Sequence, residues 1–263
     1  MLDFGYVLAG FVVGTIVGLT GVGGGSLMTP LLIFLFGVKP YMAVGTDLLF
    51  AAFTKLGGTV SFARQRVVPW RVVSLLSLGS LPAALATLAV LHWVGPADPR
   101  VQSIMTGTLG VALLLTAAAM AYKAVRGQQL PRQLAPADEA RASQPRHWSL
   151  PVLLGAAIGT LVTLTSVGAG AIGVSVLLLL YPLLPLPRIV AADIAYAVPL
   201  TLVAGLGHAS LGSVDWPLLA KLLAGSLPGI WLGTRLTQHT PDRLVRSLLS
   251  ALLAWAGLKL VAL

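Results

Sequence analysis

A glycine-rich run near the N-terminus is the first stretch that could do chemistry. Five of the nine residues from Gly18 to Ser26 are glycine. A helix that begins at Gly25 or Ser26 leaves its first backbone N–H groups without intrahelical partners, and its dipole places about half a positive charge there. Because glycine lets an oxyanion approach such amides closely, we predict a small-anion site. Its expected ligands are Thr20, Gly23, Gly24, Gly25 and Ser26.

A second run of the same kind follows 145 residues later. It offers Thr165, Ser166, Gly168 and Gly170 as further ligands. One glycine run could serve only helix packing, because small residues let membrane helices approach closely. Two runs at equivalent places, each beside a short apolar segment, favour the functional interpretation. Two such helix starts that face each other would form one anion site.

Asp47, Lys55 and Asp193 are ionisable residues that lie within long apolar segments. Burial of a charge in the membrane costs at least about 2.5–3.5 kcal/mol, which makes each of them a functional candidate. We predict that Lys55 supplies positive charge to the anion, with a structural pair between Lys55 and Asp47 as the alternative. Asp47 and Asp193 are predicted either to couple transport to protons or to cap helix N-termini. The sequence predicts no catalytic residues, no metal ligands and no cofactor.

The framework that holds these residues is predicted to be a membrane protein. Of the 263 residues, 57% are hydrophobic and 10% are charged, whereas soluble domains carry about 25% charged residues. The net charge of +9 is attributed to cytoplasmic loops and not to a nucleic-acid partner. Since no basic region precedes the first apolar segment, we expect that segment to be retained.

Internal repeats indicate a duplicated chain. An offset of 146 residues places Asp47 on Asp193, Trp70 on Trp216 and the GSLP motif at 79–82 on the same motif at 225–228. We therefore expect a first transmembrane repeat at 1–123, a polar cytoplasmic linker at 124–149 and a second transmembrane repeat at 150–263.

Each half contains five apolar segments, of which the first two are short. They are expected at 4–19, 26–37, 43–63, 72–94 and 101–122, and at 150–165, 169–184, 190–211, 217–236 and 244–263. A segment of 12 residues extends only about 18 Å, well under the hydrocarbon thickness of about 30 Å. The fold class predicted is an all-α polytopic membrane protein with two inverted repeats of five membrane-embedded segments. Each repeat has a short glycine-broken helical hairpin followed by three spanning helices. Re-entrant hairpins and pairs of short full spans would put the same loops on the same side of the membrane, so the distribution of charge does not distinguish between them.

The basic residues decide the orientation, because cytoplasmic loops carry an excess of Lys and Arg. If the short pairs are hairpins, one side holds most of the arginines, and the other carries Asp3, Lys39, Asp98, Arg100, Asp215 and Lys259. The basic residues of the first side are Arg64, Arg66, Arg71, Arg126, Arg132, Arg141, Arg146, Arg188, Arg235, Arg243 and Arg246. The linker is therefore predicted to be cytoplasmic and both termini extracytoplasmic.

Several motifs together resemble the TauE/SafE family of sulfite exporters. They are GLTGVGGG at 18–25, AVGTDLLF at 43–50, GSLP in both halves and VDW at 214–216. The resemblance implies a multi-pass carrier in the bacterial inner membrane for sulfur-containing anions such as sulfite, sulfonates or sulfoacetate, with proton coupling. The first half departs from the pattern, since it has RVVPW at 66–70 where the second has GSVDW at 212–216.

The predicted function is thus a secondary transporter, not an enzyme. Its expected partners are a small anion, protons and the lipid bilayer, and a homo-oligomer is one possible state. A passive anion channel is the main alternative, because it would use the same amides and dipoles. A membrane-embedded phosphatase would need clustered acids, whereas Asp47 and Asp193 fall in different halves.

Overall fold

The computed structural model describes residues 2–20, 25–126, 148–236 and 242–262, and their regular structure is entirely α-helical. The first half supplies α1 (Leu2–Thr20), α2 (Gly25–Phe36), α3 (Pro40–Arg64), α4 (Trp70–Val94) and α5 (Pro99–Arg126). The second half supplies α7 (Ser149–Thr165), α8 (Ala171–Leu180), α9 (Leu186–Ser210), α10 (Trp216–Leu236) and α11 (Asp242–Val261).

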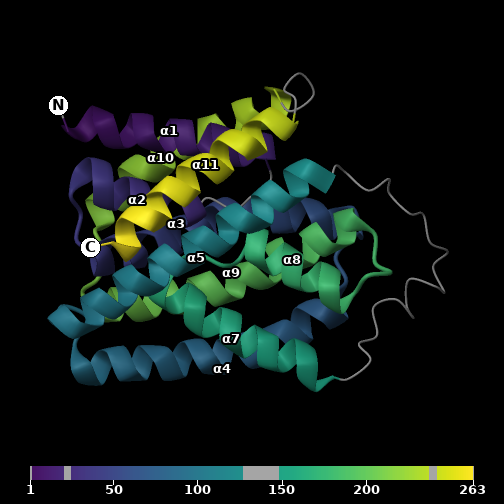
Figure 1. Ribbon diagram of the computed structural model, residues 1–263, viewed down its shortest axis with the longest axis horizontal. Helices are drawn as coiled ribbons and strands as arrows, with labels where there is room; N and C mark the ends of the chain where they lie inside the picture. The colour runs from purple at the N-terminus through teal and green to yellow at the C-terminus, as the bar shows by residue number, and fades with distance from the viewer. Residues whose placement is uncertain (1, 21–24, 127–147, 237–241, 263) are drawn as a thin grey trace.

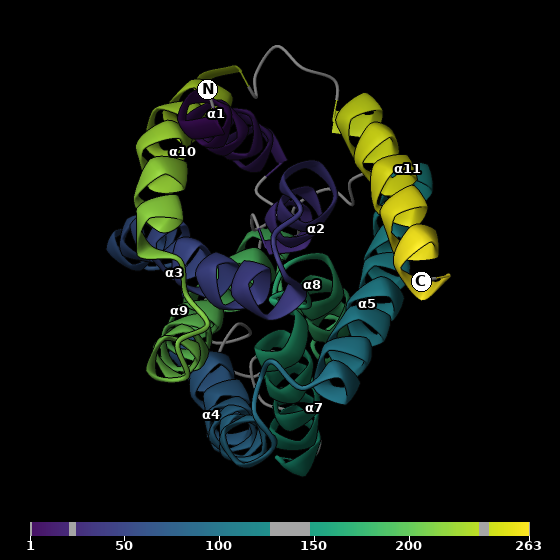
Figure 2. The same ribbon diagram turned by 90° about the vertical axis from the view of Figure 1, so that its left-hand side faces the viewer.

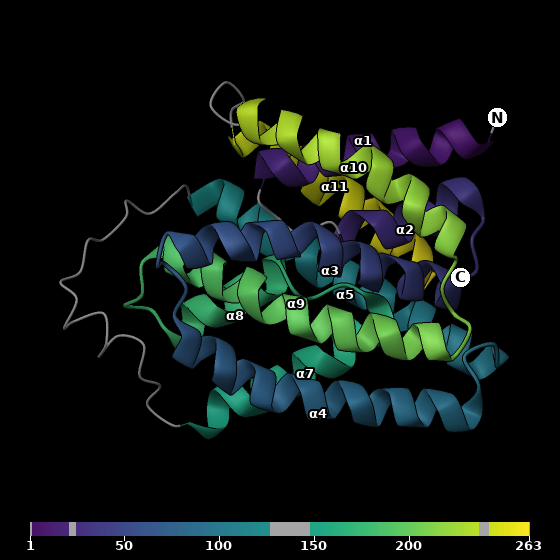
Figure 3. The ribbon, with the colours of Figure 1, turned by 180° about the vertical axis from the view of Figure 1, so that it is seen from behind.

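The helices form a bundle whose long axis runs horizontally in Figure 1. The start of α1 and the end of α11 lie at the same end of this bundle, and the end of α5 and the start of α7 lie at the other (Figures 1 and 3). Viewed from the end where the termini lie, the short helices α2 and α8 occupy the centre, with the longer helices around them (Figure 2). The fold therefore places the helix that follows each glycine run in its interior.

Three helices of the described chain are long and apolar enough to cross a membrane by length and composition. They are Trp70–Val94, Pro99–Tyr122 and Leu186–Ser210. The bundle also exposes large apolar side chains on its outer helices, as expected of a surface that faces lipid. Examples are Leu78, Leu85, Leu115, Leu202, Trp231 and Leu252.

Small residues bring helices of the two halves into close contact. A Cβ atom at Gly14 of α1 would lie 2.4 Å from the carbonyl oxygen of Ser226 on α10. In the matching contact, a Cβ atom at Gly159 of α7 would lie 2.5 Å from the carbonyl oxygen of Ser80 on α4. The helix pairs α1–α10 and α4–α7 accordingly make the most extensive interhelical contacts. The GSLP motif has a packing role here, because its serine lies against a glycine of the other half.

Two helix pairs, α3 with α9 and α5 with α11, run antiparallel to each other. Gly45 near the start of α3 approaches Ser213, just after the end of α9, whereas Gly58 near the end of α3 approaches Ile194. The helices α5 and α11 are also antiparallel, because Gly110 approaches Val261 whereas Leu114, further along α5, approaches the earlier residue Gly257. The two 25-residue helices α3 and α9 also begin and end 146 residues apart.

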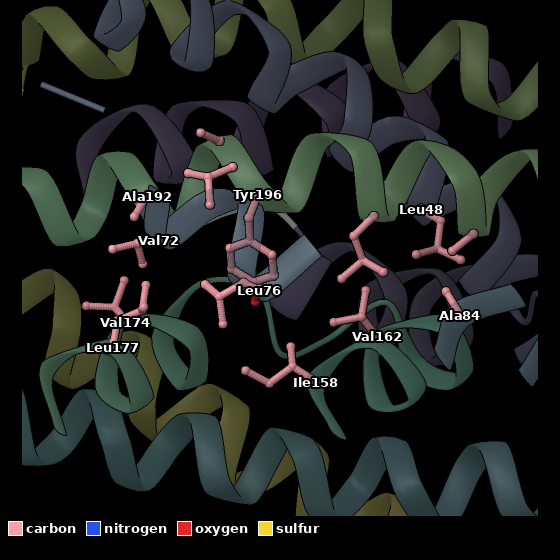
Figure 4. Packing of buried hydrophobic residues seen from close by; sticks show 14 of the residues in the cluster. Leu48, Val72, Leu76, Ala84, Ile158, Val162, Val174, Leu177, Ala192 and Tyr196 are labelled. Carbon is pink, nitrogen blue, oxygen red and sulfur yellow. The ribbon is translucent and has the colours of Figure 1, made fainter. Parts of the chain in front are cut away.

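Two apolar clusters surround the central helices. One gathers side chains of α4, α7 and α9 around Val174 and Leu177 of α8 (Figure 4). The other gathers side chains of α1, α5, α10 and α11 around Leu27, Met28 and Leu32 of α2. Each short helix is thus fixed by a core of its own.

The helix bounds follow the expected segments closely, with one clear difference. The segment expected at 169–184 is helical only from Ala171 to Leu180. Pro182 and Pro185 follow it. Because proline removes a helical hydrogen bond and restricts the residue before it, the helix ends at Leu180, just before Tyr181.

Candidate functional site

The second glycine run forms a tight break between α7 and α8. Gly168 and Gly170 have φ angles of +135° and +143°, which L-residues with a side chain rarely adopt. The α8 helix then begins at Ala171, and the amide of Gly173 in its first turn bonds to the Gly168 carbonyl at 2.9 Å. The glycines are therefore needed for the backbone path that presents the N-terminus of α8 to the interior.

Two hydroxyl residues of this break have different roles. Thr165 Oγ1 donates to the carbonyl of Leu161 at 2.6 Å and accepts from the amide of Val167 at 3.1 Å, so it is occupied locally. Ser166 is buried, and its Oγ makes no hydrogen bond within the described residues. Ser166 also adopts a left-handed φ of +59°, an uncommon conformation for a residue other than glycine. Of the two, Ser166 is the one whose hydroxyl is available to a ligand.

Lys55 of α3 reaches across the bundle to this same break. Its Nζ donates to the carbonyl oxygen of Ala169 at 2.9 Å, and the residue is only 6% exposed. The carboxylates of Asp193 and Asp47 both attract the ammonium group. A structural pair with Asp47 alone therefore does not describe the surroundings of Lys55, because Lys55 interacts with groups of both halves.

Asp47 is fully buried and connects α3 to the first turns of α2. Its Oδ2 accepts a hydrogen bond of 2.5 Å from Thr29 Oγ1, and its Oδ1 has no partner within the described residues. The Ser166 side chain lies close enough to stabilise the carboxylate, although no hydrogen bond of good geometry joins them. Asp47 thus stands between the start of α2 and the break that precedes α8.

Asp193 occupies the matching position beside α8. Its Oδ1 would lie 2.0 Å from a Cβ atom at Gly173, so the carboxylate rests directly on the first turn of that helix. Neither aspartate caps its own helix, because the N-cap residues of α3 and α9 are Lys39 and Pro185. Each carboxylate instead lies beside the N-terminal part of a short central helix.

The predicted site residues are only partly brought together by the described structure. Ser166, Gly168, Gly170, Lys55, Asp47 and Asp193 gather around the break before α8. Gly25 begins α2 and Ser26 is buried in its first turn. Gly23, Gly24 and the side chain of Thr20 lie outside the described residues.

Sequence reasoning missed three participants of this cluster. Thr29 gave no signal beyond lying three residues after the run, and a backbone carbonyl such as that of Ala169 cannot be recognised from the residue type. Tyr196 of α9 also escaped notice, although its position was detectable, because it lies three residues after Asp193 on the same face of a helix. Its hydroxyl lies 3.2 Å from the point where a Gly173 Cβ would be.

Comparisons with known proteins agree with the sequence resemblance. A sequence profile described as "Sulfite exporter TauE/SafE" matches residues 6–260. The chain is 37% identical over 258 residues to the probable membrane transporter protein YjnA of Bacillus subtilis, covering 97% of this chain and 98% of the relative. The probable membrane transporter protein YdhB of the same organism is 26% identical over 261 residues, covering 97% and 98%. No solved structure matches the chain significantly.

Proposed function

The chain belongs to the sulfite exporter TauE/SafE family of membrane transporters, and from this premise we propose that it is a secondary carrier of a small sulfur-containing anion. Sulfite, a sulfonate or sulfoacetate is the expected class of substrate, since the family is described as sulfite exporters. The anion is proposed to move across the bacterial inner membrane together with protons.

The architecture proposed for this carrier is a pair of inverted repeats, 1–123 and 150–263, joined by a linker at 124–149. The antiparallel pairs α3–α9 and α5–α11 support the inversion, because equivalent helices of inverted repeats run in opposite directions. The matched glycine contacts of α1 with α10 and of α7 with α4 support the duplication. In this arrangement α1–α2 and α7–α8 are re-entrant hairpins, each of which enters and leaves the membrane on one side. The two hairpins enter from opposite sides of the membrane.

The observation that carries the proposed function is the buried Lys55 ammonium at the break before α8. A cation that donates to the Ala169 carbonyl is held beside a helix N-terminus, where the dipole also favours negative charge. We propose that an anion binds between Lys55, Ser166 and the first amides of α8. The equivalent run at Thr20, Gly23, Gly24, Gly25 and Ser26 is proposed to contribute from the start of α2.

Asp47 and Asp193 are the proposed proton carriers. A carboxylate beside each short helix competes with an incoming anion for the positive N-terminal end of that helix. An anion therefore binds more readily when the carboxylates are protonated. Protonation and anion binding would then favour each other, and this linkage is what a proton-coupled carrier requires.

The proposed orientation puts the arginine-rich end in the cytoplasm and both termini outside it. Arg64, Arg66, Arg71, Arg188 and Arg235 flank the described helices at one end. Lys39, Asp98, Arg100, Asp215 and Lys259 flank them at the other, which is the less basic end.

The substrate is tested by uptake into proteoliposomes that contain the full chain, with an inward pH gradient. Sulfite, sulfate, sulfoacetate, taurine, acetate and phosphate are supplied one at a time, and internal anion is measured by ion chromatography. Uptake of one or two sulfur oxyanions is the expected result. Equal entry of all six would indicate a channel, and entry of none into vesicles with folded protein would overturn the proposed function.

A further inference from the structure

Tyr196 of α9 carries a buried hydroxyl that has no part in the proposed anion and proton sites. The residue is 0% exposed, and its hydroxyl makes no hydrogen bond within the described residues. Figure 4 shows the ring reaching from α9 into the apolar cluster, with the oxygen at its far end near Leu76. A buried hydroxyl without a partner destabilises the folded state, and native proteins rarely contain one without a reason.

The hydroxyl lies at the N-terminal turn of α8. It is 3.2 Å from the position of a Cβ at Gly173, the third residue of that helix, and Asp193 Oδ1 is 2.0 Å from the same position. A side chain at residue 173 would displace both oxygens, so glycine there keeps the turn accessible to them. Tyr196 therefore adds a hydrogen-bond donor at the positive end of a ten-residue helix.

The first half lacks this hydroxyl. The offset of 146 residues that relates Asp47 to Asp193 places Phe50 on Tyr196, and Phe50 is equally buried at 1% exposure. A ring is enough to fill the core in that half. The extra oxygen in the second half is therefore not required by packing alone.

We propose that the Tyr196 hydroxyl is a substrate-binding donor that selects oxyanions with three acceptor oxygens, such as sulfite and sulfonates, over planar carboxylates. This inference rests on the proposed function. Donors surround the break from several sides: Tyr196 from α9, Ser166 from the end of α7, Lys55 from α3 and the amides at the start of α8. A pyramidal or tetrahedral group can accept from several directions at once, whereas a carboxylate accepts within one plane.

The test compares Tyr196→Phe with Tyr181→Phe in the full chain, reconstituted in proteoliposomes. Tyr181 is the matched control, because its hydroxyl is also buried without a partner in the described residues but lies at the other end of α8. The readouts are the KM for sulfite and sulfoacetate, the inhibition of their uptake by methanesulfonate and by acetate, and the melting temperature.

Tyr196→Phe is expected to raise both KM values about tenfold and to weaken inhibition by methanesulfonate more than inhibition by acetate. Tyr181→Phe is expected to leave these values unchanged. Wild-type KM values in Tyr196→Phe, or a melting temperature that falls with unchanged inhibition, would overturn the inference, since the hydroxyl would then be structural. If the wild type transports neither anion, it is the proposed function that fails, and this inference fails with it.

Discussion

The ammonium nitrogen of Lys55 lies 2.9 Å from the carbonyl oxygen of Ala169, although 114 residues separate the two in the sequence. The bond joins α3 of the first half to the glycine break of the second. Because Lys55 is almost fully buried and attracted by both Asp193 and Asp47, it links the groups that we propose bind the anion and carry protons. The site is therefore built by both halves of the chain.

Lys55→Gln is expected to destabilise the protein at neutral pH. The substitution leaves Asp47 and Asp193 without their nearby cation, and an uncompensated buried charge costs about 3–5 kcal/mol. Lowering the pH should reduce the difference from wild type, because protonated carboxylates no longer need the cation. Melting temperatures in detergent at pH 7.5 and pH 5 measure this, with Lys221→Gln as the control, since Lys221 lies near the start of α10. Equal melting of Lys55→Gln and wild type at both pH values would contradict the expectation.

Asp47→Asn is expected to abolish anion accumulation driven by a pH gradient while leaving anion exchange intact. The amide oxygen of asparagine can still accept from Thr29, which preserves the contact, but the side chain cannot exchange a proton. Accumulation and counterflow of the transported anion are measured in parallel. Asp98→Asn serves as the control, because the Asp98 side chain accepts a hydrogen bond from the exposed backbone amide of Arg100 at the end of the bundle. Wild-type accumulation by Asp47→Asn would assign the coupling to another group.

Gly159→Ala is expected to destabilise the bundle by about 1–3 kcal/mol, the usual cost of overpacking. The added Cβ would lie 2.5 Å from the Ser80 carbonyl oxygen, and only a shift of α7 away from α4 can relieve that overlap. The matched control is Gly107→Ala on α5, where a Cβ would meet nothing within 4 Å. Because alanine has a better helix propensity than glycine, this substitution should slightly stabilise the protein. Thermal unfolding of both variants measures the difference, and equal effects would argue against tight α4–α7 packing.

The proposed orientation is tested with single cysteines, because the chain has none of its own. Lys39→Cys and Gln65→Cys place an exposed thiol at opposite ends of α3. In intact cells whose outer layers are permeable to the reagent, a membrane-impermeant maleimide should label position 39 at once and position 65 only after lysis. The reverse pattern would place the arginine-rich end outside the cytoplasm.

Much of the helical framework could be predicted from the sequence, because apolar segments and glycine or proline breaks are local signals. The segments expected at 43–63 and 72–94 correspond to α3 and α4 within three residues at each end. The end of α8 at Leu180 could also have been predicted from the local sequence, because Pro182 and Pro185 follow it. The segment was expected to continue because its residues stay mostly apolar as far as Leu184.

The partners of the buried polar groups could not be predicted in the same way. Lys55 was expected near an anion or Asp47, yet it donates a hydrogen bond to a backbone carbonyl, and any residue type can provide one. Thr165 was expected to be a ligand, but its hydroxyl bonds within its own turn, a common alternative for threonine in a helix. The GSLP motif indicated a duplication from the sequence alone, whereas the close contact of Ser80 with Gly159 depends on which helices meet across the halves.

Proton coupling is tested by accumulation of the transported anion against its own concentration gradient. Proteoliposomes with equal sulfite or sulfoacetate inside and outside receive an inward pH gradient, and the internal anion is followed with and without a protonophore. A coupled carrier predicts that internal anion rises several-fold above external and returns to equality when the protonophore is added. Anion that only equilibrates, with or without the pH gradient, would contradict a proton-coupled carrier and identify a passive pathway.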